Sequence, residues 1–193
     1  MTDTTDTTDN VEEYAHNLPI ELVSLARRVI EENRAAGLRV AVAESCTGGL
    51  VSAALTAIPG CSEIFEAGFV TYSNAMKMKT LNVAADVLDT FGAVSVATAW
   101  AMAQGVLHFA DVDVGVAITG VAGPGGGTDK KPVGTVVFAR ASRSADPEEV
   151  VADLKEFGDL GRCEIRRQAA LCALELLLPG PPPEAAPAIV PSP

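Results

Sequence analysis

Three short segments of the chain carry residues whose types and spacing could do chemistry. The first, residues 44–49 (ESCTGG), follows an apolar run and precedes a stretch with helical character. Its small hydroxyls and glycines would let the backbone approach a ligand closely, and a helix starting here would offer unpaired N–H groups to an anion or a developing oxyanion. The same residues also fit a plain Ser/Thr helix cap with a tight turn, so this segment alone leaves both interpretations open.

The second segment, residues 69–77 (FVTYSNAMK), places a lysine near the start of a predicted helix. We expect Asn74 to be the N-cap, which puts Lys77 in the first helical turn. A cation is unfavourable at the positive end of a helix dipole. An environment that disfavours the charged form lowers the pKa of a lysine, so Lys77 could act as a neutral base. For a single lysine, however, a tolerated surface position is the simpler explanation.

The third segment is a glycine-rich loop between two predicted strands, residues 119–128 (TGVAGPGGGT), followed by 131–135 (KPVGT). Such a turn can direct successive backbone N–H groups at a phosphate. It contains neither the G-K-[ST] of a Walker P-loop nor the G-x-G-x-x-G of a dinucleotide-binding turn. A phosphate site and a flexible surface loop explain it equally well.

Predicted strands alternate with predicted helices along the chain, which is typical of a three-layer α/β/α sandwich. Ligands of such sheets bind where strands end, and all three segments lie at strand ends. The predicted strands cover residues 38–43, 69–72, 112–118, 133–141 and, at an edge, 149–157. The predicted helices cover residues 19–36, 48–57, a short stretch from 75, 84–91, 96–110 and 162–178.

Composition divides the chain into three parts and excludes several classes of function. We expect a disordered acidic tail at 1–14, one globular domain at 15–178 and a proline-rich disordered tail at 179–193. A formal charge of −11 argues against a nucleic-acid partner. The chain shows no secretory signal and no apolar run of the roughly 18–20 residues that a membrane span needs, so we expect a cytoplasmic protein with no membrane partner. The cysteines and the two histidines lack zinc-ligand spacing, and we expect no metal or cofactor.

Taken together, the three segments and the G-A-V-S of residues 92–95 resemble, in order and spacing, the CinA carboxy-terminal-domain family over about residues 20–178. The resemblance implies a three-layer α/β fold and a nicotinamide-nucleotide amidohydrolase. Its substrate would be a small nucleotide, with nicotinamide mononucleotide and water giving nicotinate mononucleotide and ammonia, in pyridine nucleotide recycling. Members stand alone or follow a larger N-terminal domain. The 193 residues leave no room for that fusion, so we expect the stand-alone form, as a homo-oligomer.

The resemblance also implies roles for individual residues. Ser45 would be the nucleophile and Lys77 the base, with Tyr72 beside it at the strand end. A neutral lysine can take the hydroxyl proton and later give it to departing ammonia. Thr47 and the glycine amides after it would contact the oxyanion or the amide. The residues expected to contact substrate are Glu44, Cys46, Thr47, Gly48, Gly49, Asn74, Thr119, Gly120, Ala122, Gly123 and Arg162.

The chain departs from the family pattern at two places. The family has an acid after G-A-V-S, but Val96 stands there in this chain. The family's late F-x-G-D-R appears as residues 157–162 (FGDLGR), with extra residues, which weakens Arg162 and Arg166 as phosphate contacts. Glu44 fits two roles equally, an orienting carboxylate or a charge at a strand end.

Two other functions remain open at the level of sequence. The first is a catalytically silent, nucleotide-binding oligomeric adaptor associated with competence. A pure binder has no chemical need for a serine together with a lysine, which favours the enzyme. The second is hydrolysis through Cys46, and it is weaker because neither histidine lies in a matching motif to form the usual thiolate pair.

Overall fold

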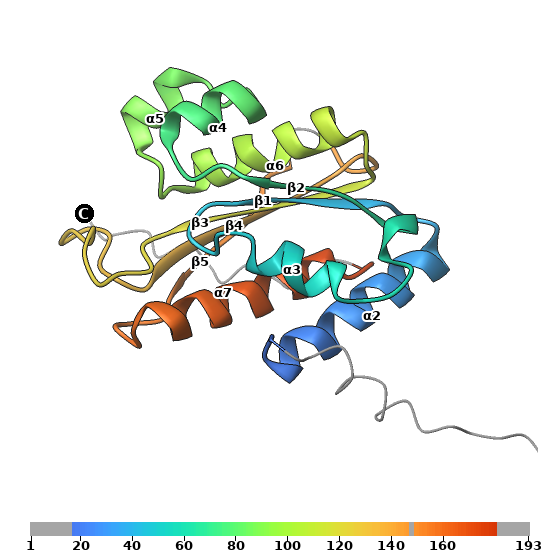
Figure 1. The fold of residues 1–193 in the computed structure, drawn as a ribbon. Helices are drawn as coiled ribbons and strands as arrows, with labels where there is room; N and C mark the ends of the chain where they lie inside the picture. Colours follow the sequence, from blue (N-terminus) through green and yellow to red (C-terminus); the bar gives the residue numbers. More distant parts are fainter. Residues whose placement is uncertain (1–16, 147–148, 181–193) are drawn as a thin grey trace, which may run out of the picture.

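The computed structural model describes residues 17–146 and 149–180, which form a three-layer α/β/α sandwich (Figure 1). The central sheet has the strand order β2-β1-β3-β4-β5. Strand β1 pairs in parallel with β2 and β3, and β4 is antiparallel to both β3 and β5. The predicted fold class is confirmed, and β5 lies at an edge as expected. The strands are β1 Val40–Glu44, β2 Phe65–Val70, β3 Val114–Gly120, β4 Thr135–Ser142 and β5 Val151–Glu156.

Helices cover both faces of this sheet (Figure 1). One face carries α2 (Ile20–Ala36), α3 (Leu50–Thr56) and α7 (Arg162–Leu177). The other carries α4 (Asn74–Leu81), α5 (Ala85–Phe91) and α6 (Val96–Ala110), and a short 3₁₀ turn, η1 (Cys61–Glu63), precedes β2. No helix of the described ranges is long and apolar enough to cross a membrane. The predicted N-terminal tail and all but two residues of the predicted C-terminal tail lie outside these ranges.

Two predicted boundaries were wrong for reasons that lie in the backbone. Helix α3 begins at Leu50 and not at Gly48, because Gly48 and Gly49 have φ angles of 61° and 92°, which no right-handed helix adopts. Strand β2 begins at Phe65 and ends at Val70, so Thr71 and Tyr72 belong to the connection that follows it. Both differences move catalytic candidates out of regular elements and into the loops that join them.

The two faces of the sheet bury side chains of different size. Large residues such as Val116 and Phe138 face α2, α3 and α7, whereas alanines such as Ala117 and Ala139 face α6. Small side chains let helices approach closely. A Cβ atom at Gly105 in α6 would lie only 2.3 Å from the carbonyl oxygen of Leu81, the last residue of α4. The position of α4 is therefore set by close contact with α6.

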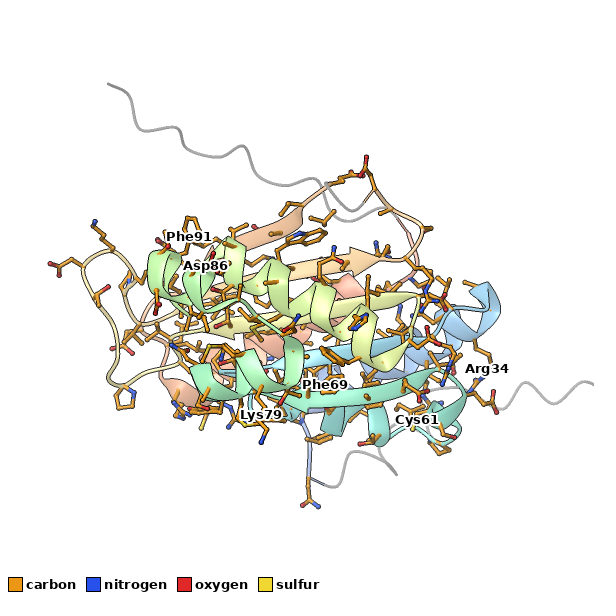
Figure 2. All side chains as sticks on the ribbon, turned by 90° about the horizontal axis from the view of Figure 1, so that it is seen from above. Arg34, Cys61, Phe69, Lys79, Asp86 and Phe91 are labelled. Atoms are coloured by element: carbon orange, nitrogen blue, oxygen red, sulfur yellow. The ribbon has the colours of Figure 1, made fainter. Side chains whose placement is uncertain are left out.

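Most of the buried polar side chains gather at one end of the sheet, where the parallel strands have their C-terminal ends. The parallel strands β1, β2 and β3 all end here. The antiparallel strand β4 begins at the same end of the sheet, and β5 ends there, since Thr135 pairs with Glu156. Viewed from above in Figure 2, Phe91 lies toward this end and Arg34 and Cys61 lie at the opposite end. The buried polar residues at the end near Phe91 are Glu44, Ser45, Thr47, Thr71, Lys77, Thr119 and Thr135. Open α/β sheets bind ligands at this end, beyond the carboxyl ends of their parallel strands.

Candidate active site

Ser45 and Lys77 lie side by side at this end of the sheet, although 32 positions separate them in the sequence. The Lys77 Nζ lies 3.0 Å from the Ser45 Oγ and 2.7 Å from the carbonyl oxygen of Thr71. The side chain of Lys77 is only 1 % exposed, and burial lowers its pKa from the ordinary lysine value. An ammonium has three N–H donors, but only these two oxygens are within reach among the described residues. In the structure Nζ donates to the Ser45 Oγ, and the lowered pKa favours the neutral amine, whose lone pair could accept the hydroxyl proton at this distance.

Helix α4 brings Lys77 to this position. Its N-cap is Ser73, whose Oγ accepts a hydrogen bond from Met76 N at 3.2 Å, so the expectation that Asn74 caps the helix was wrong. Asn74 is the first helical residue and its side chain is exposed. Lys77 lies one turn from the cap, and its amide donates to the Ser73 carbonyl at 3.1 Å. Lys79, further along α4, is exposed (Figure 2), so burial and not a neighbouring cation lowers the Lys77 pKa.

Glu44 lies directly before Ser45 and does not reach the surface. Its side chain is 0 % exposed. One carboxylate oxygen accepts hydrogen bonds from the amides of Gly49 (2.9 Å) and Val51 (3.2 Å). The other accepts from the amide (2.8 Å) and the hydroxyl (2.7 Å) of Ser52. All four hydrogen bonds of the Glu44 carboxylate therefore lie within the turn and the first residues of α3.

The amides at the end of this turn are already engaged. The Gly49 amide donates to Glu44, and the Gly48 amide donates to the Ser45 carbonyl at 3.2 Å. The amides of Cys46 and Thr47 face the Cys46 sulfur, and their contacts lower the pKa of that thiol against the larger, opposite effect of burial. Thr47 is wholly buried, and the Cys46 amide directly follows Ser45 in the chain.

The Cys46 side chain is buried and points to no thiolate chemistry. Burial raises the pKa of the Cys46 thiol to about 12, so the sulfur stays protonated near neutral pH. Lys77 is the one cation that acts on this thiol, and its effect is smaller than that of burial. Of the two candidate nucleophiles in this turn, only Ser45 has a basic partner within hydrogen-bond distance.

Two arginines on the first turns of α7 reach the site from the other side. Arg162 donates to the Gly123 carbonyl and to the Tyr72 hydroxyl, both at 2.9 Å. Arg166, one turn later, donates to the Thr47 carbonyl through Nε at 3.1 Å and Nη2 at 2.7 Å. The Tyr72 side chain is 60 % exposed, and its hydroxyl accepts a hydrogen bond from Arg162 and none from Lys77. Tyr72 and Arg162 therefore lie at the mouth of the site.

The glycine-rich loop is tied to its surroundings at both ends. The Thr119 hydroxyl is buried and donates to the Ala93 carbonyl at 2.8 Å, so it is already engaged. Gly120 has no room for a side chain, because a Cβ atom would lie 2.8 Å from the Thr135 carbonyl. Ala122 and Gly123 are buried, and the stretch 124–130 is exposed. At its far end Lys131 donates to the carbonyl of Phe91 at 2.7 Å.

Three contributors to the site escaped the sequence analysis. The Thr71 carbonyl has no side-chain signal that sequence could reveal. Ser52 was visible only as a polar residue in an otherwise apolar helix. Arg166 was considered for phosphate, whereas it binds the turn itself. No cluster of three or more His, Cys, Asp or Glu side chains that could hold a metal ion exists within residues 17–146 and 149–180.

Comparison with known proteins agrees with this fold and these motifs. The profile of the CinA C-terminal domain matches residues 22–179. A protein of Enterobacter agglomerans named nicotinamide-nucleotide amidohydrolase PncC is 43% identical over 86% of this chain and 95% of its own length. A CinA-like protein of Syntrophotalea carbinolica is 52% identical over 73% of this chain. The chain spans only about a third of that protein's length and of several similar relatives.

Solved structures show the same architecture. The crystal structure of the competence/damage inducible protein CihA from Agrobacterium tumefaciens superposes with a TM-score of 0.79 at 46% sequence identity. The match covers 82% of this chain and 94% of that one.

Proposed function

The chain belongs to the CinA C-terminal domain family, and from this membership together with the Ser45–Lys77 pair we propose that it is a nicotinamide-nucleotide amidohydrolase. The proposed reaction converts nicotinamide mononucleotide and water to nicotinate mononucleotide and ammonia, a step in recycling pyridine nucleotides. The named activity of the Enterobacter relative, which aligns along nearly its whole length, supports the substrate. The observation that carries the proposal is the buried lysine 3.0 Å from a serine hydroxyl.

The geometry supports a two-step hydrolysis. Neutral Lys77 takes the hydroxyl proton as the Ser45 Oγ attacks the carboxamide carbon, giving a tetrahedral intermediate. Lys77 returns that proton to the amide nitrogen, the C–N bond breaks, and ammonia leaves an ester on Ser45. A water molecule then attacks the ester while Lys77 accepts its proton. Collapse of the second intermediate returns the proton to Ser45 and releases the acid.

Charge stabilisation comes from the two sides of the turn. We take the Cys46 amide, which directly follows Ser45, as the donor for the developing oxyanion, and a preorganised donor of this kind contributes roughly 10²–10³ to the rate. Arg162 is an exposed cation at the mouth, 2.9 Å from Tyr72, and is the residue we expect to meet the phosphate of a nucleotide. Its hydrogen bonds to Gly123 and Tyr72 link the glycine-rich loop to the end of β2.

Ammonia release from nicotinamide mononucleotide tests the proposal, with Ser45→Ala as the matched control. Ammonia and nicotinate mononucleotide should appear in equal amounts with the wild-type protein and be absent with Ser45→Ala. Because Ser45→Ala changes one oxygen atom in the buried turn, its melting temperature shows whether the fold is kept. Equal, background-level release from both proteins would contradict the proposal and favour the silent nucleotide-binding adaptor. Light scattering on the same sample tests the proposed homo-oligomer.

A further inference from the structure

We infer that Glu44 is the positioning residue of this site, and that its buried carboxylate fixes the nucleophile turn so that Ser45 stays in line with Lys77. The inference rests on the proposed function for its kinetic test. It assigns to Glu44 no contact with substrate, because the side chain is 0 % exposed. The role acts entirely through residues 45–52, which run from the nucleophile to the first turn of α3.

Four hydrogen bonds fold this segment around one carboxylate. The oxygens of Glu44 each accept two donors, from Gly49 and Val51 on one and from Ser52 twice on the other. These donors lie five to eight positions further along the chain, so the carboxylate closes a loop that contains the whole turn. No Lys or Arg of the described residues pairs with Glu44. Its charge is balanced by N–H and O–H donors alone.

A second strand holds Ser52 against Glu44. A Cβ atom at Gly68 of β2 would lie 2.1 Å from the Ser52 Oγ, a distance that no real contact shows. Glycine at 68 therefore leaves exactly the room that the Ser52 hydroxyl occupies when it donates to Glu44. Gly68, Ser52 and Glu44 form a chain of contacts that ends one residue before the nucleophile.

The backbone of Glu44 connects this chain to the base. Its carbonyl accepts a hydrogen bond from the amide of Thr71 at 2.9 Å, and the Thr71 carbonyl holds the Lys77 Nζ at 2.7 Å. The backbone of residue 44 thus fixes, through Thr71, the position of the Lys77 amine. The side chain of Glu44 fixes the turn that carries Ser45. A change confined to the Glu44 side chain should move Ser45 relative to a base that stays in place.

The test replaces the carboxylate by its isosteric amide. In Glu44→Gln one oxygen becomes an NH₂ group, which faces two donors and cannot accept from either. We expect kcat to fall by about 10²-fold, since a misplacement of about 1 Å in a reacting group has that effect, with KM for nicotinamide mononucleotide within about 3-fold of wild type. The pH at which kcat/KM rises should change little, because burial, and not Glu44, lowers the pKa of Lys77. A raised KM with wild-type kcat would overturn the inference by showing a substrate contact.

The Gly68–Ser52 contact supplies a second test that leaves Glu44 untouched. Ser52→Ala removes one of the four donors and should lower kcat modestly. Gly68→Ala pushes the Ser52 hydroxyl away from Glu44 and should lower kcat further. In the double variant the added methyl group no longer meets a hydroxyl, so kcat should return to the level of Ser52→Ala. If the fold-reductions in kcat of the two single variants multiply in the double variant, the proposed chain of contacts is contradicted. If circular dichroism shows that Glu44→Gln does not fold, the Ser52 and Gly68 variants test the positioning role of Glu44 in its place.

Labelling of Ser45 separates this inference from the proposed function. A fluorophosphonate forms an O–P bond to an activated serine and releases fluoride, and mass spectrometry measures the rate without any substrate. If wild type releases no ammonia but labels at Ser45, and Glu44→Gln labels at least about 10-fold more slowly, the amidohydrolase proposal falls and the positioning role stands. Equal labelling rates in the two proteins would overturn the positioning role. Absence of both ammonia and label in wild type would overturn both.

Discussion

Two ionisable side chains flank Ser45, and they are buried in opposite ways. On the α3 side, Glu44 accepts four hydrogen bonds, from three backbone amides and one hydroxyl of residues 49–52. On the α4 side, Lys77 reaches only the Ser45 hydroxyl and the Thr71 carbonyl. Both are at most 1 % exposed, so water compensates neither. The carboxylate oxygens of Glu44 are each filled by two donors, whereas the Lys77 amine has few acceptors and burial lowers its pKa.

The difference between Glu44 and Lys77 shows how one end of the sheet can provide both a rigid framework and a reactive group. A buried group whose hydrogen-bonding capacity is filled becomes part of the framework. A buried group whose capacity is left incomplete has a shifted pKa and becomes chemically useful. The two sides of Ser45 should therefore respond differently to substitution, in size and in pH dependence.

The largest expected effect comes from the reactive side. Lys77→Met and Lys77→Arg should each lower kcat/KM for ammonia release by at least about 10³-fold, since a general base contributes 10²–10⁴ and a guanidinium cannot lose its proton. In wild type, kcat/KM should rise with pH through an ionisation below the ordinary lysine value of 10.5. Both variants should lose that rise. Near-wild-type rates in Lys77→Arg would make residue 77 a positive contact for substrate and not a base.

The same lysine should make stability depend on pH in a defined direction. Its folded pKa lies below its unfolded value of 10.5, so between the two values the unfolded chain binds more protons and the free energy of unfolding rises with pH. Lys77→Met removes this dependence. Relative to that variant, wild type should become more stable as the pH rises toward 10, as measured by urea denaturation at a series of pH values. A constant difference across this range would show that Lys77 stays charged in the folded protein.

A smaller effect is expected on the framework side, from Arg166. Its two N–H groups hold the Thr47 carbonyl, two residues after the nucleophile. Arg166→Met should lower kcat by about 10-fold, with Arg166→Lys in between because an ammonium is a single point donor. A selective rise in KM would instead place Arg166 on the substrate. Steady-state kinetics of the three proteins, matched for thermal stability, distinguish these results.

The smallest effect should come from Cys46, which lies between the two sides. Its protonated, buried thiol has no part in the proposed mechanism, so Cys46→Ala should retain at least about half of the wild-type kcat. Removing a buried sulfur costs about 1 kcal/mol of stability through the small cavity that it leaves. Loss of turnover in Cys46→Ala together with activity in Ser45→Ala would reassign the nucleophile.

Much of the fold followed from the sequence because its signals were local. Apolar runs between glycines and prolines located each strand within a few residues, and Gly37 ends α2 in the left-handed conformation that a helix-stopping glycine predicts. The N-cap of α4 was misplaced by one residue, since Ser73 and Asn74 are both good caps and only the backbone angles separate them.

The candidate site was predictable in its reactive residues and less so in its framework. Ser45 directly follows a predicted strand, and Lys77 was expected in the first turn of the helix after the next predicted strand, which is where α4 places it. Which amides of the turn are engaged was not predictable, because Glu44 turns back to bind residues five to eight positions later. The role of Arg166 also depends on how α7 packs across the sheet, over a separation of 119 positions that no local pattern encodes.

Strand β2 lies at an edge of the sheet and none of its residues is fully buried, in contrast to β1, where all five are. The base depends on this edge, since Thr71 and α4 follow β2 directly. Segments with little burial open more often than the rest of a protein, without global unfolding. Amide hydrogen exchange should therefore be faster in residues 65–70 than in β1 and β3. On warming, the Ser45–Lys77 pair should separate before the core melts, and heat inactivation should precede loss of the folded sheet.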